Sequence, residues 1–163
     1  MGNITLNNST SLTVGGTATF QIAGTVNNNG TINAGGTIEF NGTGAQIIPG
    51  LNYNNLISSS TGSRTISFGS TVGISGSFTP GNNSYTTTGS TFIYNGTSAQ
   101  SINATFAYHN LTISNNSGLT ASANQTVNGT LNLSAANPSA IKGALDMSGS
   151  AVLFMGDTAR TIG

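Results

Sequence analysis

Apolar and polar residues alternate along most of this chain. Ala18, Phe20 and Ile22 lie on one side of an extended segment, with polar residues between them. Similar short alternating segments follow at residues 91–94 and 110–113, and runs of Gly, Asn and Ser separate them. A helical i, i+3, i+4 stripe is found nowhere in the sequence. The pattern therefore predicts short β-strands joined by tight turns.

A six-residue period strengthens this prediction near the N-terminus. A glycine, a threonine and a β-branched apolar residue recur at 24–26, 30–32 and 36–38, and Gly42-Thr43 continues the series. Glycine allows a tight corner, and Val and Ile suit a pleated interior. Hexapeptide periods are typical of parallel β-helices.

A longer repeat organises the whole chain, at intervals of roughly 54–60 residues. The pattern aromatic, polar, Gly, small polar, x, Ala, long polar, x, Ile occurs at 40–48, at 94–102 and, less regularly, at 154–162. We expect the aromatic residue to occupy one equivalent place in each unit and the glycine to form a corner. The residues that carry this structural repeat are Phe40, Gly42, Gln46, Tyr94, Gly96, Gln100, Phe154 and Gly156.

These repeats predict an all-β protein, a parallel β-helix (β-solenoid) that forms a single domain over residues 1–163. Each repeat unit would hold three windings of roughly 18–20 residues. About eight or nine windings would then stack, with strands about 4.8 Å apart along the axis. The alternative is a β-sandwich array, because turns at this spacing also suit sandwiches.

The two ends of the sequence are related. Residues 3–13 match residues 110–120, so the chain begins halfway through a unit. One interpretation is a piece of a long repeat array. The other is that copies stack head to tail and complete each other's repeat, because an uncapped solenoid end exposes a strand edge. The residues expected to mediate this self-association are Ile4, Thr5, Leu6, Ala159, Arg160, Thr161 and Ile162.

Composition excludes several classes of partner. Only 4% of the residues are charged and the net charge is zero, so phosphate-neutralising nucleic-acid binding and attraction to anionic membranes are not expected. No apolar run is long enough to insert into a membrane. The chain has no cysteine, which rules out disulfides and thiolate metal sites. With 36% apolar residues in alternation, disorder is not expected either.

The chain resembles a known class of repeat at residues 37–48, which are followed by 53–57. Residues 95–100 and 110–113 carry the same features. Together they resemble the β-helix repeats of bacterial extracellular and surface proteins of the filamentous-haemagglutinin-like adhesin type. The resemblance implies a right-handed helix, an extracellular or cell-surface location, and a structural or adhesive role. It supplies no catalytic residues.

Residues with catalytic or metal-binding chemistry are few and scattered. The acids are Glu39, Asp146 and Asp157, in different units, whereas a polysaccharide-cleaving site needs carboxylates that converge. His109 is the only histidine and has no second metal ligand near it in sequence. Arg64 stands apart from the other basic residues. We therefore expect no enzyme activity, no cofactor and no metal.

Two functions agree with these expectations. The first is a structural subunit of a surface fibre or matrix. The second is a stalk or glycan-binding module of an adhesin, in which exposed aromatics such as Tyr53 and Tyr108 contact surface glycans. Buried aromatics would favour the first, and aromatics that line a groove would favour the second. Ice binding is a weaker third, since Thr-x-Thr occurs only at 17–19 and 86–88.

Overall fold

Parallel pairing joins the described strands of this protein. The computed structural model describes residues 2–102, 104–121, 124–134, 145–146 and 151–154. Within these ranges the secondary structure consists of strands and turns, without a helix. Every strand pair is parallel, as in a chain that winds repeatedly in one direction. The prediction of a parallel β-solenoid is confirmed, and the sandwich alternative is wrong.

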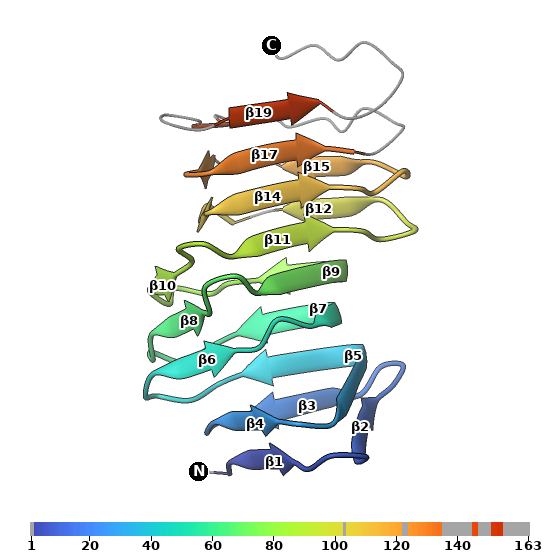
Figure 1. Ribbon diagram of the computed structural model, residues 1–163, viewed down its shortest axis with the longest axis vertical. Helices are drawn as coiled ribbons and strands as arrows, with labels where there is room; N and C mark the ends of the chain where they lie inside the picture. Colours follow the sequence, from blue (N-terminus) through green and yellow to red (C-terminus); the bar gives the residue numbers. More distant parts are fainter. Residues whose placement is uncertain (1, 103, 122–123, 135–144, 147–150, 155–163) are drawn as a thin grey trace.

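The largest sheet runs along the whole described solenoid. Figure 1 shows its upper strands one above another. It consists of β2 (Ser11–Val14), β3 (Thr19–Ile22), β5 (Thr31–Phe40), β7 (Asn52–Ser58), β9 (Thr71–Thr79), β11 (Thr91–Tyr94), β14 (Asn110–Ile113), β17 (Thr130–Leu133) and β19 (Ala151–Phe154).

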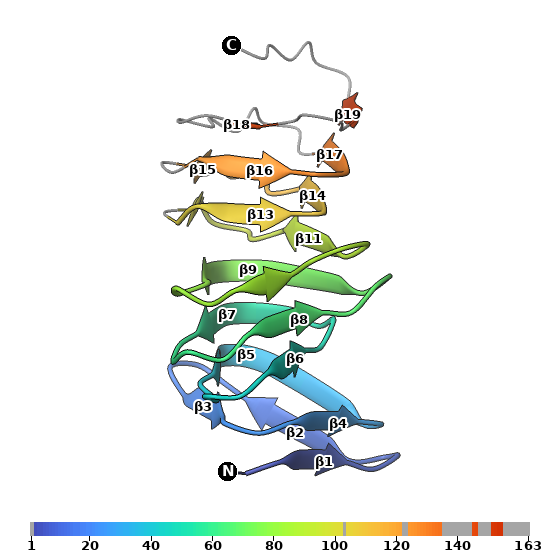
Figure 2. The same cartoon turned by 90° about the vertical axis from the view of Figure 1, so that its left-hand side faces the viewer.

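The remaining strands form small parallel sheets on the other sides of the solenoid. Figure 2 looks onto the side that carries β1, β4, β6, β8, β13 and β16. These sheets are β1 (Ile4–Leu6) with β4 (Val26–Asn28); β6 (Gln46–Ile48) with β8 (Arg64–Ile66) and β10 (Tyr85–Thr86); β12 (Gln100–Ile102) with β15 (Leu119–Ala121); and β13 (Phe106–Tyr108) with β16 (Gln125–Val127) and β18 (Leu145–Asp146).

Each winding of the chain, which we call a coil, visits three faces in turn. In the upper coils the order is β11 on face 1, β12 on face 2 and β13 on face 3, after which β14 returns to face 1. In the lower coils, β5, β7 and β9 are long enough to bend from face 1 onto face 2, while β1, β4, β6, β8 and β10 lie on face 3.

The strand register gives the length of a coil. Val72, Phe92, Leu111, Leu131 and Val152 are successive partners on face 1. A coil therefore takes about 20 residues, at the upper limit of the expected length. The described part of the chain makes about seven coils, and the prediction of eight or nine was made for the whole sequence.

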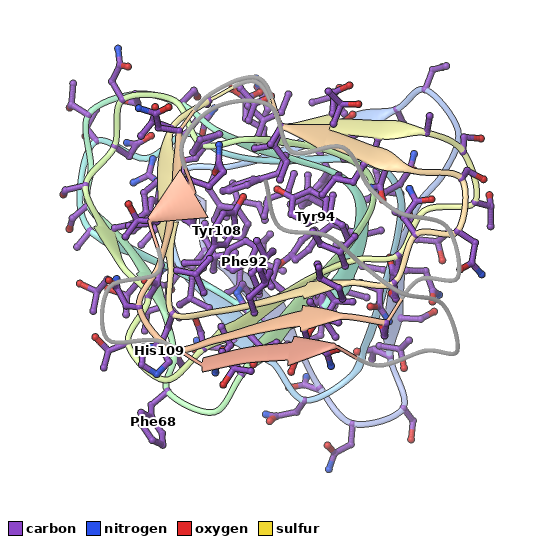
Figure 3. All side chains as sticks on the ribbon, turned by 90° about the horizontal axis from the view of Figure 1, so that it is seen from above. Phe68, Phe92, Tyr94, Tyr108 and His109 are labelled. Atoms are coloured by element: carbon purple, nitrogen blue, oxygen red, sulfur yellow. The ribbon has the colours of Figure 1, made fainter. Side chains whose placement is uncertain are left out.

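The interior is filled by side chains that this register places above one another (Figure 3). Burying each Val, Leu, Ile or Phe contributes about 1.5–3 kcal/mol, so the stacked interior supplies the main stabilising free energy. The central coils are aromatic. Phe92 contacts Phe78 at 5.3 Å, Phe106 at 5.4 Å and Tyr108 at 5.3 Å between ring centroids. Among the described residues no helix is long and apolar enough to cross a membrane.

Candidate functional site

The repeated motif is a corner that a glutamine closes. In the first copy the N–H of Gly42 donates to Oε1 of Gln46 at 2.8 Å. Nε2 of Gln46 donates down to the coil below, to the carbonyl oxygens of Ile22 (2.9 Å) and Gly24 (2.8 Å). The amide of Gln46 is buried, and hydrogen bonds satisfy it at both ends.

The second copy repeats this geometry. Gly96 N–H donates to Oε1 of Gln100 at 2.9 Å, and Nε2 of Gln100 donates to the carbonyls of Ile74 and Gly76, both at 2.9 Å. The aromatic and isoleucine positions of both copies are buried, as the sequence predicts for inward-pointing residues. The long polar residue of the motif is therefore a structural clamp between coils.

The two copies lie at different corners, so the prediction of one equivalent place per unit is wrong. In the first copy, Phe40 is the last strand residue on face 2 and Gln46 is the first on face 3. In the second copy, Tyr94 is the last strand residue on face 1 and Gln100 is the first on face 2. The physical reason is that the interval between the two copies is not a whole number of coils. Phe154 does share a column with Tyr94, three coils above it, while Gly156 lies outside the described residues.

Arg64 lies in the interior, directly above Gln46 in the ladder of β6 and β8, with 0% of its surface exposed. Its isolation in the sequence did not predict this position. The guanidinium donates to the hydroxyl of Ser58 at 2.9 Å and to five carbonyl oxygens of two coils. These carbonyls belong to Phe40 (3.1 Å), Gly42 (3.1 Å), Gly44 (3.4 Å), Ser59 (2.6 Å) and Ser63 (3.2 Å).

Above the second copy, Leu119 takes the ladder position of Arg64, and Asn115 donates to the glutamine corner. Its Nδ2 donates to the carbonyl of Ser98 and to Oε1 of Gln100, both at 2.8 Å, and the residue is buried. Ser98 corresponds to Gly44, which accepts from Arg64 in the first copy. A neutral amide and a cation thus share one equivalent carbonyl acceptor. Burial lowers the pKa of Arg64, and neighbouring Tyr85 acts in the opposite direction.

The tyrosines proposed to contact glycans are inside the solenoid. Tyr53 is 1% exposed and Tyr108 is 0% exposed. The Tyr53 hydroxyl donates to the carbonyl of Pro49 at 2.8 Å, and the hydroxyls of Tyr94 and Tyr108 lie 2.9 Å apart. Burial raises the pKa of all three tyrosines well above the ordinary value, and raises that of Tyr85 to about 12.

In the described part of the chain, no cluster of acids and histidine forms a metal site. Glu39 lies on face 2, where it accepts hydrogen bonds from Ser59 Oγ at 2.6 Å and Gln21 Nε2 at 2.9 Å. These bonds lower the pKa of Glu39. Asp146 is in β18, and Asp157 lies outside the described residues. The described ranges contain no group of three or more His, Cys, Asp or Glu residues that could hold a metal ion.

The outer surface carries neutral polar ladders. Asn33 donates to Thr13, Asn55 to Thr37 and Asn110 to Thr91, each one coil below. The side-chain oxygens of three asparagines also accept a backbone N–H from the coil above, once on each face. These bonds join Thr25 to Asn3 (3.0 Å), Ser77 to Asn55 (3.0 Å) and Thr130 to Asn110 (2.9 Å). In β2, β5, β9, β11 and β14 the outward residues of face 1 include Ser, Thr, Asn, Gly and Ile, and they form no regular Thr-x-Thr array.

One cleft opens where β7 turns from face 1 to face 2. At this corner β7 has only Asn54 between its paired residues, whereas β5 has two glycines and β9 has Ser75 and Gly76. The shorter corner recedes between its neighbours and leaves a cleft of about 560 Å³. Its polar lining comes from Asn33, Asn52, Asn54 and Ser75, and Ile32 and Leu51 add apolar surface.

Two large apolar side chains are exposed, and some of the predicted association residues are described. Phe68 is 84% exposed, at the same corner as His109 in Figure 3, and Ile47 is 59% exposed. Ile4, Thr5 and Leu6 form β1 at the lowest coil. The other predicted association residues, Ala159, Arg160, Thr161 and Ile162, lie outside the described residues.

Comparisons with protein-family models, curated proteins and solved structures found no match to this chain.

Proposed function

We propose that this protein is an extracellular structural protein, a β-solenoid subunit of a surface fibre or matrix. One observation carries the proposal: the aromatic side chains that the structure describes, apart from Phe68, are used inside the stack and not on its surface. A continuous ladder of backbone hydrogen bonds along the axis makes such a body stiff. The extracellular location rests on the resemblance to bacterial surface repeats.

In this proposal, copies join head to tail through the ends of the solenoid, with no enzymatic activity and no cofactor. The base supplies the edge of β1, and the other end supplies the segment that contains Ala159, Arg160, Thr161 and Ile162. A parallel strand edge with no partner is a template for another strand. Neither nucleic acid nor membrane insertion has a role.

Electron microscopy of the purified chain over a wide concentration range tests this function. We expect threads one solenoid wide that lengthen with concentration. Immunogold labelling of intact source cells is expected to place the protein outside the cell. Discrete monomers at every concentration would contradict the fibre role.

A stalk or glycan-binding module is the second candidate, and the cleft at the β7 corner favours it. Its lining is uncharged and offers amide and hydroxyl groups to a neutral sugar. A glycan array would test it, with Asn54→Ala in the cleft and Asn27→Ala on the exposed part of face 3 as the matched control. Binding that both variants retain would remove the cleft as the site.

A further inference from the structure

The same pair of layers occurs twice inside the solenoid. A corner layer carries the glutamine motif (residues 37–48 and 91–102), and a cover layer lies directly above it (residues 55–66 and 110–121). In the upper pair, Asn110 N–H donates to the carbonyl of Ser90 at 3.0 Å and Ser114 N–H to that of Tyr94 at 2.9 Å.

The base of the solenoid is a cover layer whose corner layer is absent from the described chain. Residues 3–13 match residues 110–120 of the cover layer in sequence. Leu111 and Leu119 are buried in that layer, but their counterparts Ile4 and Leu12 are only half-buried. Buried Asn115 has the exposed Asn8 as its counterpart. At the base, the same residue types therefore lack the corner layer that lies beneath them in the internal pair.

The backbone at the base is equally incomplete. Ile4 N–H donates up to Thr25 at 2.8 Å, and the Leu6 carbonyl accepts from Asn29 at 2.9 Å. Thr5 lies between them, and since successive backbone groups alternate in direction, its N–H and C=O point away from β4. Among the described strands β1 pairs only with β4. The counterpart of Thr5 is Thr112, which pairs with Ile93 below it.

The opposite end presents the matching strand. β19 pairs with β17 on one side, and no other described strand covers its other edge. Its residues occupy the face 1 column of β11, three coils higher, and Phe154 begins the third copy of the motif. β19 is therefore the first strand of a corner layer without a cover layer in the described chain.

We propose that the base of a second copy docks on β19 and reproduces the β11–β14 interface between molecules. The inference rests on the proposed head-to-tail assembly and specifies its joint. By the internal register, Val152 pairs with Ile4, Leu153 with Thr5 and Phe154 with Leu6 of the second copy. Asn7 N–H donates to the Phe154 carbonyl, as Ser114 does to that of Tyr94.

The joint also sets the rotation between copies. β1 lies on face 3, whereas β19 belongs to the face 1 sheet. For these two strands to pair, the second copy must be rotated about the solenoid axis until its face 3 lies above face 1 of the first copy. Helical reconstruction of threads is expected to show this rotation, and faces that continue straight across the joint would overturn the proposed pairing.

Two proline variants test the joint. Thr5→Pro removes a donor that points out of the base, and Val152→Pro removes one on the open side of β19; a proline on an open edge costs no ladder bond inside the molecule. In sedimentation velocity the unaltered chain is expected to form a concentration-dependent series of oligomers. Each variant alone should remain monomeric. A mixture of the two should stop at dimers, because one intact base then meets one intact β19.

Matched controls separate docking from folding. Thr112→Pro makes the same change in the internal cover layer and is expected to lower the melting temperature, whereas Thr5→Pro should leave that of the monomer unchanged. Oligomers that survive both edge variants would overturn this joint while leaving fibre assembly in place. A chain that stays monomeric at all concentrations would overturn both, and would indicate that other polypeptide covers the base.

Discussion

At the scale of single residues, Arg64 is a buried cation held without a described carboxylate. Its planar fork meets five carbonyl oxygens and one hydroxyl from loops that the winding brings together. Carbonyl dipoles replace a counter-ion, and each donor is satisfied, which makes the burial tolerable. In the second copy Leu119 lies above Gln100, and the neutral amide of Asn115 reaches one acceptor, Ser98, that corresponds to an acceptor of Arg64.

Arg64→Lys is therefore expected to destabilise the protein although it keeps the positive charge. An ammonium has three donors and cannot reach the oxygens that the guanidinium bridges. Several buried carbonyls lose their partner, and we expect a loss of roughly 3 kcal/mol in the free energy of unfolding. Denaturant titration measures it, with Gln21→Leu on the exposed part of face 2 as a control near zero. Equal denaturation midpoints for both variants would contradict the proposed role of the Arg64 guanidinium.

The raised pKa values of the buried tyrosines determine how the free energy of unfolding should change at alkaline pH. Burial raises the pKa of Tyr85 to about 12, and those of Tyr53, Tyr94 and Tyr108 are raised as well. An unfolded tyrosine ionises near a pH of about 10. The folded state thus keeps protons that the unfolded state loses, so this contribution is complete below about pH 10 and falls as the pH rises toward 12 and above.

We expect tyrosinate absorbance and loss of the β circular-dichroism signal to appear together in an alkaline titration. The ring that ionises first is Tyr85, which is only half-buried. Full tyrosinate absorbance near pH 10 with an unchanged circular-dichroism spectrum would show that the rings are accessible, against their position in the interior.

At the scale of the element, the glutamine corner is a module that works at more than one face. Gln46 and Gln100 make the same three hydrogen bonds at different corners of the solenoid. The partners in these three bonds belong to the motif itself or to the coil directly below. The module therefore needs a coil beneath it but no particular face.

The glycines of this corner should differ in their tolerance of a side chain. A Cβ at Gly42 would clash with the carbonyl oxygen of Ala23 and lie 2.8 Å from the Gln46 amide carbon, while one at Gly44 meets nothing within 4 Å. We expect Gly42→Ala to cost about 1–3 kcal/mol by overpacking. Gly44→Ala should stay within about 0.5 kcal/mol, in keeping with Ser98 at this place in the second copy. Denaturant midpoints compare the pair, and similar losses would contradict the packing of the corner.

At the scale of the whole molecule, the protein has few charges that could interact over long distances. The sequence has three basic and three acidic residues, and those whose contacts the structure describes, Glu39 and Arg64, bond to neutral groups. Packing between coils and ladders of neutral hydrogen bonds supplies the cohesion. This also keeps the surface free of the charge repulsion that would oppose end-to-end contact.

The melting temperature is therefore expected to be nearly constant between about 0.01 M and 0.15 M NaCl, although the screening length falls from about 30 Å to 8 Å. Differential scanning fluorimetry at low protein concentration measures it on monomers. A shift of more than about 4 °C, equivalent to at least 1 kcal/mol in a chain of this size, would reveal a charge interaction that the described contacts do not include.

Alternation, the hexapeptide period and the glycine corners were sufficient to predict parallel strands, a filled interior and polar ladders outside. These features depend on neighbours in sequence: side chains alternate about the backbone, and a corner needs a small residue at a fixed offset. The inward aromatic and isoleucine of the motif followed in the same way. The interpretation of Gln46 and Gln100 went no further than a repeated position, because their partners lie in another coil.

Only the tertiary structure decided which face each motif occupies and which residues meet across coils. The face depends on the accumulated length of all preceding coils, and on face 1 successive coils are not equally long. Such a small difference per coil cannot be read from a local pattern. Arg64 is buried for the same reason: its acceptors come from segments up to 24 residues away, and only the winding brings their carbonyls into one place.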